Sequence, residues 1–241
     1  MRAEQLVISE RFCGPPGTGN GGYVCGRVAV HLGPSAAVRL KAPAPLDTEL
    51  RIEVDREQVR LLHGERLIAE AKRATLDLAA LEPVSFSDAT EAVGRYLGFK
   101  AHAFPRCFVC GPQREPGDGL RIFPGPIEAR SIVAAPWVPE ASLADGDGRV
   151  RPEFLWAALD CSGGFSVLPV PEGKAIVLGE LTARIDAPVA AGERCTVAGW
   201  SLGTDGRKRR AGSAVYDSRG NPVAVAQATW IEINRSAFDA D

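Results

Sequence analysis

The stretch Arg151-Pro-Glu-Phe-Leu-Trp-Ala-Ala-Leu-Asp-Cys-Ser-Gly-Gly-Phe-Ser-Val167 decides how the rest of the chain must fold. Pro152 suits the first turn of a helix, where its missing N–H is not needed, and Glu153 puts a negative charge at the positive end of the helix dipole. Apolar residues then recur at helical spacing and continue around the other faces. Such a helix is wrapped by other structure rather than exposed on one side. The stretch therefore predicts a buried helix over 152–163.

Asp160 lies inside this apolar helix, and no cation stands next to it in the sequence. An unpaired carboxylate is expensive to bury, so Asp160 needs either a partner or a chemical role. A solvated or hydrogen-bonded aspartate at the edge of the helix satisfies the pattern equally well. The residue alone leaves both interpretations open.

Composition excludes several classes of protein. The chain has 241 residues, of which 45% are hydrophobic and 24% charged, as in ordinary globular domains. A net charge of −2 argues against nucleic acid or an anionic membrane as the main partner. No apolar run reaches the roughly 18 residues of a membrane span, and the N-terminus lacks the apolar core of a signal peptide. We therefore expect a cytoplasmic protein whose cysteines are reduced.

The first half predicts a helix followed by an antiparallel meander. Residues 13–22 hold five glycines and two prolines, which excludes regular structure. The apolar segment 23–32 is predicted as a helix, with a buried strand as the alternative because valine is frequent. Alternating apolar and charged residues then predict strands, with a hairpin turn at His63-Gly64. The predicted strands are 4–12, 36–42, 49–55, 58–62 and 66–78.

The second half repeats this plan after a helical connector over 84–105. In the connector, Asp88 and Glu91 form a plausible capping pair, and Gly98 can end the helix. The predicted strands that follow are 119–123 and 130–135 before the helix, and 176–186, 194–202, 207–216 and 223–233 after it.

Two local sequences support an internal duplication. Val38-Arg-Leu-Lys-Ala-Pro43 matches Ala183-Arg-Ile-Asp-Ala-Pro188, and in each a strand ends at Ala-Pro. With the shared element order, this match predicts two repeats. The predicted units are a first repeat at 1–83, the connector at 84–105, a second repeat at 106–235 and a tail at 236–241.

Several motifs resemble those of one superfamily. Ile185-Asp-Ala-Pro-Val-Ala-Ala-Gly-Glu193 and Tyr216-Asp-Ser-Arg-Gly-Asn-Pro-Val-Ala-Val-Ala226 are similar to the meander of thioesterases with the hotdog fold. Cys107-Phe-Val-Cys-Gly-Pro-x6-Gly-Leu120 resembles the segment that opens many phenylacetyl-CoA thioesterase-like domains. The resemblance implies an α+β fold, a tandem or double hotdog, in which an antiparallel sheet wraps a long helix in each half.

The resemblance also implies where a site would lie. Members often carry His-Gly-Gly before the helix, whose glycine N–H polarises the thioester carbonyl, and an Asp or Glu within the helix of the partner. Here Asn20-Gly21-Gly22 stands at the first position in the first half, and Asp160 stands at the acidic position in the second. A pseudo-dimer of the halves would bring Gly22 and Asp160 into one composite site. The opposite site would pair Ala29 with Pro152-Glu153 and should be inactive.

This arrangement predicts a hydrolase that acts on an acyl-CoA or a related acyl thioester. Gly22 would donate to the oxyanion, and Asp160 would activate water or attack the carbonyl directly. Asn20, Gly21 and Trp156 are the candidate substrate-binding residues, and Arg207 and Arg209 could meet the phosphates of coenzyme A, although a solvated hairpin explains that basic run more simply.

Two alternatives stay open from the sequence. A non-catalytic acyl or acyl-CoA binding protein would fit the missing histidine, and a hotdog hydratase or dehydratase would need a histidine that neither helix offers. We expect no cofactor other than the coenzyme A of the substrate, a small-molecule partner, and no nucleic acid or membrane partner. By analogy with double hotdogs that pair through sheet edges, a homodimer is expected.

The cysteine pattern gives little sign of a metal. Cys107 and Cys110 could be half of a zinc site, but a structural zinc needs four ligands and His102 would bring the total only to three. Cys161 is expected to be a buried thiol. The sequence therefore predicts no metal site.

Overall fold

The computed structural model describes residues 2–128 and 130–238. The strands are β1 (Arg2–Val7), β2 (Ser35–Leu40), β3 (Glu49–Val54), β4 (Gln58–His63), β5 (Arg66–Arg73), β6 (Gly125–Pro126), β7 (Ile132–Trp137), β8 (Lys174–Ile185), β9 (Cys195–Asp205), β10 (Lys208–Tyr216) and β11 (Pro222–Asn234). The α-helices are α1 (Gly21–Ala29), α2 (Phe86–Ala92) and α3 (Pro152–Ser166), and short 3-10 turns include Glu10–Phe12 and Arg235–Phe238.

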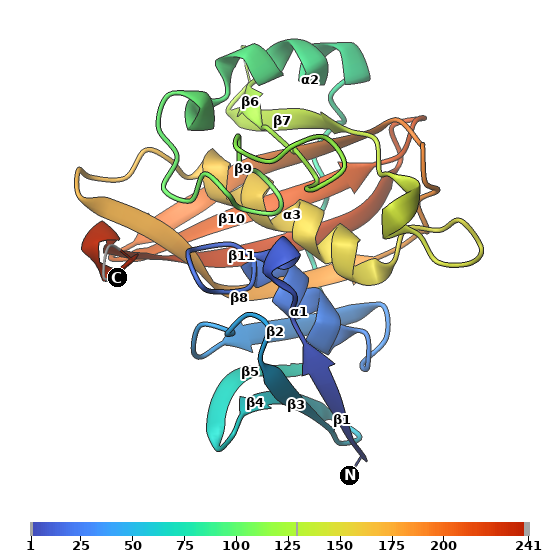
Figure 1. The fold of residues 1–241 in the computed structure, drawn as a ribbon. Coiled ribbons are helices and arrows are strands. Elements are labelled where there is room, and N and C mark those ends of the chain that lie inside the picture. The colour runs from blue at the N-terminus through green and yellow to red at the C-terminus, as the bar shows by residue number, and fades with distance from the viewer. Residues whose placement is uncertain (1, 129, 239–241) are drawn as a thin grey trace.

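The described strands form a single sheet in the order β1-β3-β4-β5-β2-β8-β11-β10-β9-β7-β6. Neighbouring strands run antiparallel throughout. The two halves join where β2 pairs with β8, with Val38 opposite Leu181. Figure 1 shows the sheet curving around α3, with α1 beside it on the same face. The sheet is therefore continuous across the two predicted repeats.

Helices α1 and α3 pack directly against each other at two glycines of α1. A Cβ on Gly22 would lie 2.7 Å from the backbone oxygen of Trp156, and one on Gly26 would lie 2.6 Å from the Cα of Glu153. The missing side chains thus allow a close approach that larger residues forbid. One apolar core surrounds both helices and includes residues of both halves, such as Leu61 and Leu181.

A smaller apolar cluster lies on the outer face of the sheet. It joins Leu76, Val84 and Ala89 to residues of β7, β9, β10 and β11. Arg184 donates to the carbonyls of Leu76 and Leu78, and the Tyr216 hydroxyl donates to that of Leu81. The segment that links the two halves is therefore bound along the outer face of the sheet. Helix α2 covers the β7 end of the sheet (Figure 1).

Most predicted elements are present, with bounds that differ by a few residues. The predicted helices 23–32 and 152–163 correspond to α1 and α3, although α1 is only nine residues long. The predicted strand 4–12 ends at Val7, because Ser9 caps a 3-10 turn. The predicted strand 66–78 ends at Arg73, after which the chain leaves the sheet.

Two predictions were wrong. Residues 119–123 form no strand; Leu120 and Ile122 donate instead to the carbonyls of Phe108 and Val109 in a buried loop. Their alternating apolar side chains fill the core without a strand partner. The cap of α2 is Ser85, whose hydroxyl accepts from the N–H of Asp88, rather than the pair Asp88 and Glu91.

Within the described residues, no helix is both long enough and apolar enough to cross a bilayer. Of the predicted tail, 236–238 belong to the last 3-10 turn, and 239–241 lie outside the described residues.

Candidate active site

Asp160 lies where α3 meets the N-terminus of α1, and its side chain is buried at 2% exposure. Its Oδ2 accepts two hydrogen bonds from the first half, from Asn20 Nδ2 at 3.0 Å and from the Gly22 N–H at 2.9 Å. Its Oδ1 is equally buried and has no partner among the described residues. Buried polar oxygens normally have partners, so the free Oδ1 marks this carboxylate as unusual.

The local sequence explains how the two donors are aimed. Asn20 caps α1, and its Oδ1 accepts from the N–H of Tyr23 at 2.9 Å. This bond fixes the amide plane, so that the Nδ2 of Asn20 faces Asp160. Gly22 is required because a Cβ there would lie 2.5 Å from the Cβ of Asp160. The contact between Asn20-Gly21-Gly22 and Asp160 that the sequence predicts is thus present.

Burial raises the pKa of Asp160 to about 7, and the nearby Cys107 adds to the rise. The hydrogen bonds from Gly22 and Asn20 oppose it, because they favour the ionised form. A carboxyl group with such a pKa is present as both acid and base near neutral pH, which is the range that general catalysis needs.

The N-terminus of α1 offers a free donor, but at Gly21 rather than Gly22. The Gly22 N–H is already bonded to Asp160. The Gly21 N–H precedes the first intrahelical bonds and has no acceptor among residues 2–128 and 130–238. Free N–H groups at a helix start attract anions and developing negative charge.

A cavity of about 790 Å³ opens at this point, between the two halves of the chain. Gly21, Asn20 and Asp160 line it on the helix side. Its remaining wall is largely apolar and includes Leu40, Phe104, Phe165, Leu178, Trp230 and Phe238. Pockets of this size and character bind small organic molecules.

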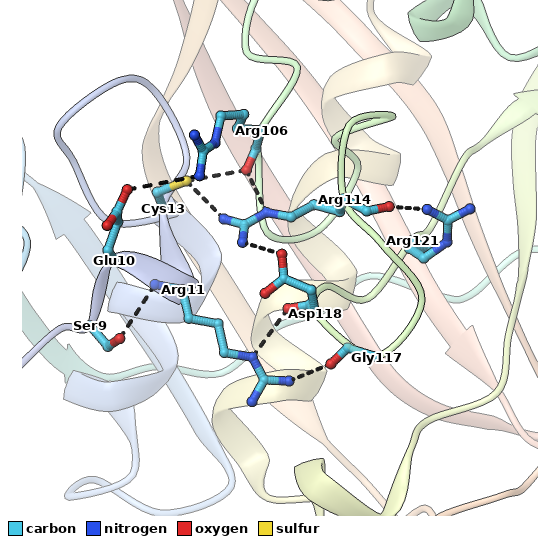
Figure 2. Close-up of polar contacts among 9 residues, drawn as sticks. All are labelled: Ser9, Glu10, Arg11, Cys13, Arg106, Arg114, Gly117, Asp118 and Arg121. Carbon is cyan, nitrogen blue, oxygen red and sulfur yellow. Dashed lines mark hydrogen bonds and ion pairs between the residues drawn. The ribbon is translucent and has the colours of Figure 1, made fainter.

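Two loops that carry site residues are tied together by a buried arginine, as Figure 2 shows. The guanidinium of Arg114 donates to Cys13 Sγ at 2.9 Å, to the carbonyl of Arg106 at 2.7 Å and to Asp118 Oδ2 at 2.7 Å. The Cys13 thiol also donates to the Arg106 carbonyl at 3.1 Å. Arg11 adds bonds to the carbonyls of Gly117 and Asp118. This network holds the loop before α1 against the segment that carries Cys107.

Three thiols lie next to Asp160 in the cavity wall. Cys107 Sγ is 3.8 Å from Cys161 Sγ and 3.7 Å from Asn20 Nδ2. Hydrogen bonds from the thiols of Cys110 and Cys161 hold the pKa of Cys107 well below its ordinary value. Burial lowers the pKa of His102, whose Nε2 lies 3.4 Å from Cys110 Sγ.

The other predicted site residues lie elsewhere. Trp156 is buried and packs its backbone against Gly22, and it does not line the cavity. Arg209 donates to the carbonyls of Val167 and Pro169 and pairs with Glu232 at 3.1 Å, which occupies its guanidinium. Arg207 is exposed at the β9–β10 turn, outside the cavity wall. The prediction that these arginines meet phosphates gains nothing from their positions.

Ala29, Pro152 and Glu153, predicted to form the inactive counterpart, do not line the cavity either. Near the Pro152 end of α3, the two helices α1 and α3 are in direct contact, with Gly26 against Glu153.

Solved structures resemble the whole chain. A tesB protein of Mycobacterium avium subsp. paratuberculosis has a TM-score of 0.63 at 11% identity and covers 96% of this chain and 93% of its own. The acyl-CoA thioesterase II TesB2 of Mycobacterium marinum has a TM-score of 0.58 at 12% identity, with 98% and 94% covered. The chain has the fold of TesB-type thioesterases. No family model and no curated protein matches the sequence.

Sequence reasoning missed how the thiols lie relative to the acid. Cys161 follows Asp160 directly, and Cys107 opens the Cys-x-x-Cys motif, so both were visible. The close approach of the sulfurs to Asp160 depends on the loop that Arg114 holds in place. No local sequence pattern predicts that contact.

Proposed function

We propose that the chain is a thioester hydrolase that acts on an acyl-CoA in the cavity beside Asp160. The observation that carries the proposal is the buried carboxylate of Asp160 in the wall of an apolar cavity, with its Oδ1 unpartnered among the described residues. Gly21, whose N–H has no acceptor among those residues, lines the same cavity. Its fold resembles those of a tesB protein and of a protein named as an acyl-CoA thioesterase II, which supports the proposal. Oδ2 alone accepts both hydrogen bonds from the α1 side, so Oδ1 is not needed for that contact. We therefore expect Asp160 to have a chemical role as well as a structural one.

In this mechanism, the two oxygens of Asp160 have different tasks. Asn20 and Gly22 hold Oδ2, which fixes the carboxylate plane. Oδ1 takes a proton from a water molecule as that water attacks the thioester carbon, or attacks that carbon itself. The carbonyl oxygen becomes an oxyanion, and the Gly21 N–H at the start of α1 donates to it. As the oxyanion collapses, the C–S bond breaks; the leaving thiolate takes the proton held by Oδ1 on the first route, and on the second route water hydrolyses the mixed anhydride that Asp160 has formed. The donor role expected of Gly22 therefore moves to Gly21.

The cavity supports an apolar acyl group and a phosphate-bearing carrier. Aromatic and aliphatic side chains form most of its wall, which favours a hydrocarbon acyl chain. Lys100 also lines it, and its ammonium group can meet the phosphates of coenzyme A. Lys41 and Lys174 line it too, but their ammonium groups bond to Glu70 and Asn234.

The test is Asp160→Asn, measured as thiol release from acyl-CoA substrates of increasing chain length. An asparagine oxygen can still accept from Asn20 and Gly22, so the fold should be retained. Loss of the base should lower kcat by about 10²–10⁴-fold. Asp205→Asn, at the exposed end of β9, is the matched control and should keep full activity. Undiminished turnover by Asp160→Asn would overturn the proposal.

A second candidate function is binding without turnover. The observation that favours it is the occupied Gly22 N–H, which leaves a single free donor where an oxyanion would form. Titration calorimetry with a non-hydrolysable acyl-CoA thioether separates the two. Tight binding by a chain that hydrolyses no member of the series would establish the binding protein.

A further inference from the structure

Three cysteines from two separate segments place their sulfurs together in the cavity wall. Cys107 and Cys110 come from the loop after the connector, and Cys161 comes from α3. The three sulfurs lie within 4.8 Å of one another, and all three residues are buried. The sequence shows only the first two as a pair, which is why it predicts no metal site.

The spacing fits a tetrahedral thiolate site. A zinc ion with Zn–S bonds of about 2.3 Å holds its sulfurs about 3.8 Å apart. Cys107 Sγ and Cys161 Sγ are 3.8 Å apart. The bond between two disulfide sulfurs is about 2.05 Å, and a disulfide would use only two of the three thiols. The cluster is thus already near the geometry of metal ligands.

Neighbouring donors can support thiolate charge at this site. Asn20 Nδ2 donates to Cys107 Sγ at 3.7 Å. The Phe104 N–H donates to His102 Nδ1 at 2.9 Å, so the proton of the neutral ring lies on Nε2, which faces Cys110 Sγ at 3.4 Å. His102 therefore donates to a sulfur and does not bind the metal itself. Such outer hydrogen bonds commonly orient metal ligands.

We propose that Cys107, Cys110 and Cys161 bind one Zn²⁺ ion, with the fourth position filled by a water molecule or other small ligand from the cavity. Thiolates are soft ligands that select zinc over magnesium or calcium. Three thiolates more than neutralise a dication, which makes the ion a weak Lewis acid. Its role is to fix the loop of Cys107 to α3 beside Asp160. The proposed zinc site does not depend on whether the protein hydrolyses thioesters in the cavity.

The experiment measures zinc in the full-length chain purified without chelators, by elemental mass spectrometry. We expect about one zinc ion per chain. Cys107→Ser, Cys110→Ser and Cys161→Ser should each lose it, whereas Cys195→Ser, which removes a buried thiol of β9 outside the cluster, should keep it. His102→Ala should weaken zinc binding by about 10-fold or more without abolishing it.

A second measurement keeps the proposal testable if a serine variant fails to fold. Wild-type chain treated with a chelator should take up Cd²⁺ with the ultraviolet charge-transfer band of cadmium thiolates, and added Zn²⁺ should raise its Tm. Wild-type chain that holds no zinc and gives no such band would overturn the proposal. So would copper in place of zinc, or a native disulfide between two of the three cysteines.

Discussion

At the scale of single residues, the site depends on a glycine and an aspartate that face each other across two helices. Gly22 gives its N–H to Asp160, and its missing Cβ leaves the room that Asp160 needs. The same close approach explains why Asp160 is buried enough to have a raised pKa. Packing and electrostatics are therefore coupled at this contact.

Gly22→Ala tests this coupling. The added Cβ would lie 2.5 Å from the Cβ of Asp160 and 2.7 Å from the carbonyl of Trp156, and backbone cannot yield cheaply. We expect a loss of about 1–3 kcal/mol in the free energy of unfolding, measured with urea. Gly146→Ala, where nothing lies within 4 Å of the added carbon, should change it by less than about 0.5 kcal/mol. Equal stabilities for the two variants would contradict the packing argument.

Sequence reasoning identified these residues but not their hydrogen bonds. Asp160 stood out because a carboxylate interrupts an apolar helix, and Asn20-Gly21-Gly22 stood out through its resemblance to the His-Gly-Gly segment of hotdog thioesterases. Which amide is free depends on the hydrogen bonds of Asp160. Its Oδ2 accepts from the Gly22 N–H, so the free N–H is that of Gly21.

At the scale of elements, the loops 8–20 and 105–121 decide where the site residues lie. The Phe108 N–H donates to the Cys13 carbonyl, and the Asn20 N–H donates to the Phe12 carbonyl. Arg114 then joins both loops through its guanidinium, as Figure 2 shows. Apart from the short 3-10 turn at Glu10–Phe12, the two loops have no helix or strand to hold them, so this buried side chain reinforces their backbone contacts.

We expect Arg114→Met to weaken the contact between these two loops. The substitution removes charge-assisted bonds worth about 1.5–3 kcal/mol each, so we expect a loss of roughly 2–4 kcal/mol in stability. Arg106→Met is the matched control, because that side chain is 70% exposed and only 3.9 Å from Glu10 in a surface pair. It should cost less than about 1 kcal/mol. Thermal unfolding followed by circular dichroism compares them, and similar losses would argue against a special role for Arg114.

The elements that sequence patterns predicted best are those with a clear period. The strands predicted at 36–42, 49–55 and 58–62 alternate, and their bounds agree closely with β2, β3 and β4. Residues 119–123 alternate too, but Leu120 and Ile122 are buried by a neighbouring loop. Alternating apolar and polar residues indicate that one face of a segment is buried, but they do not indicate whether a neighbouring strand pairs with it.

At the scale of the whole molecule, the two halves share their sheet and their core. β2 pairs with β8, α1 packs on α3, and one apolar cluster contains residues of both halves. The Ala-Pro match and the order of elements predict an internal repeat, and that stays a prediction. The continuous sheet was not predicted, because pairing between distant strands leaves no local trace in the sequence.

This shared core predicts that both halves unfold together. All four tryptophans, at 137, 156, 200 and 230, lie in the second half. Trp156 also packs against Gly22 and Gly26 of α1, so the tryptophan fluorescence reports the second half and its contact with α1. Hydrogen exchange of peptides from β3, β4 and β5 reports the first half. We expect the same free energy of opening from both probes, because neither half can expose its face of the β2–β8 joint without exposing the other's.

The variant Leu181→Ala tests directly whether the two halves unfold together. Leu181 is fully buried at the joint, opposite Val38 of β2. Its truncation should lower the free energy of unfolding by about 2–5 kcal/mol, and by the same amount for both probes. A loss confined to the tryptophan signal would mean that the first half stands on its own, and that the cavity between the halves can open while each half stays folded.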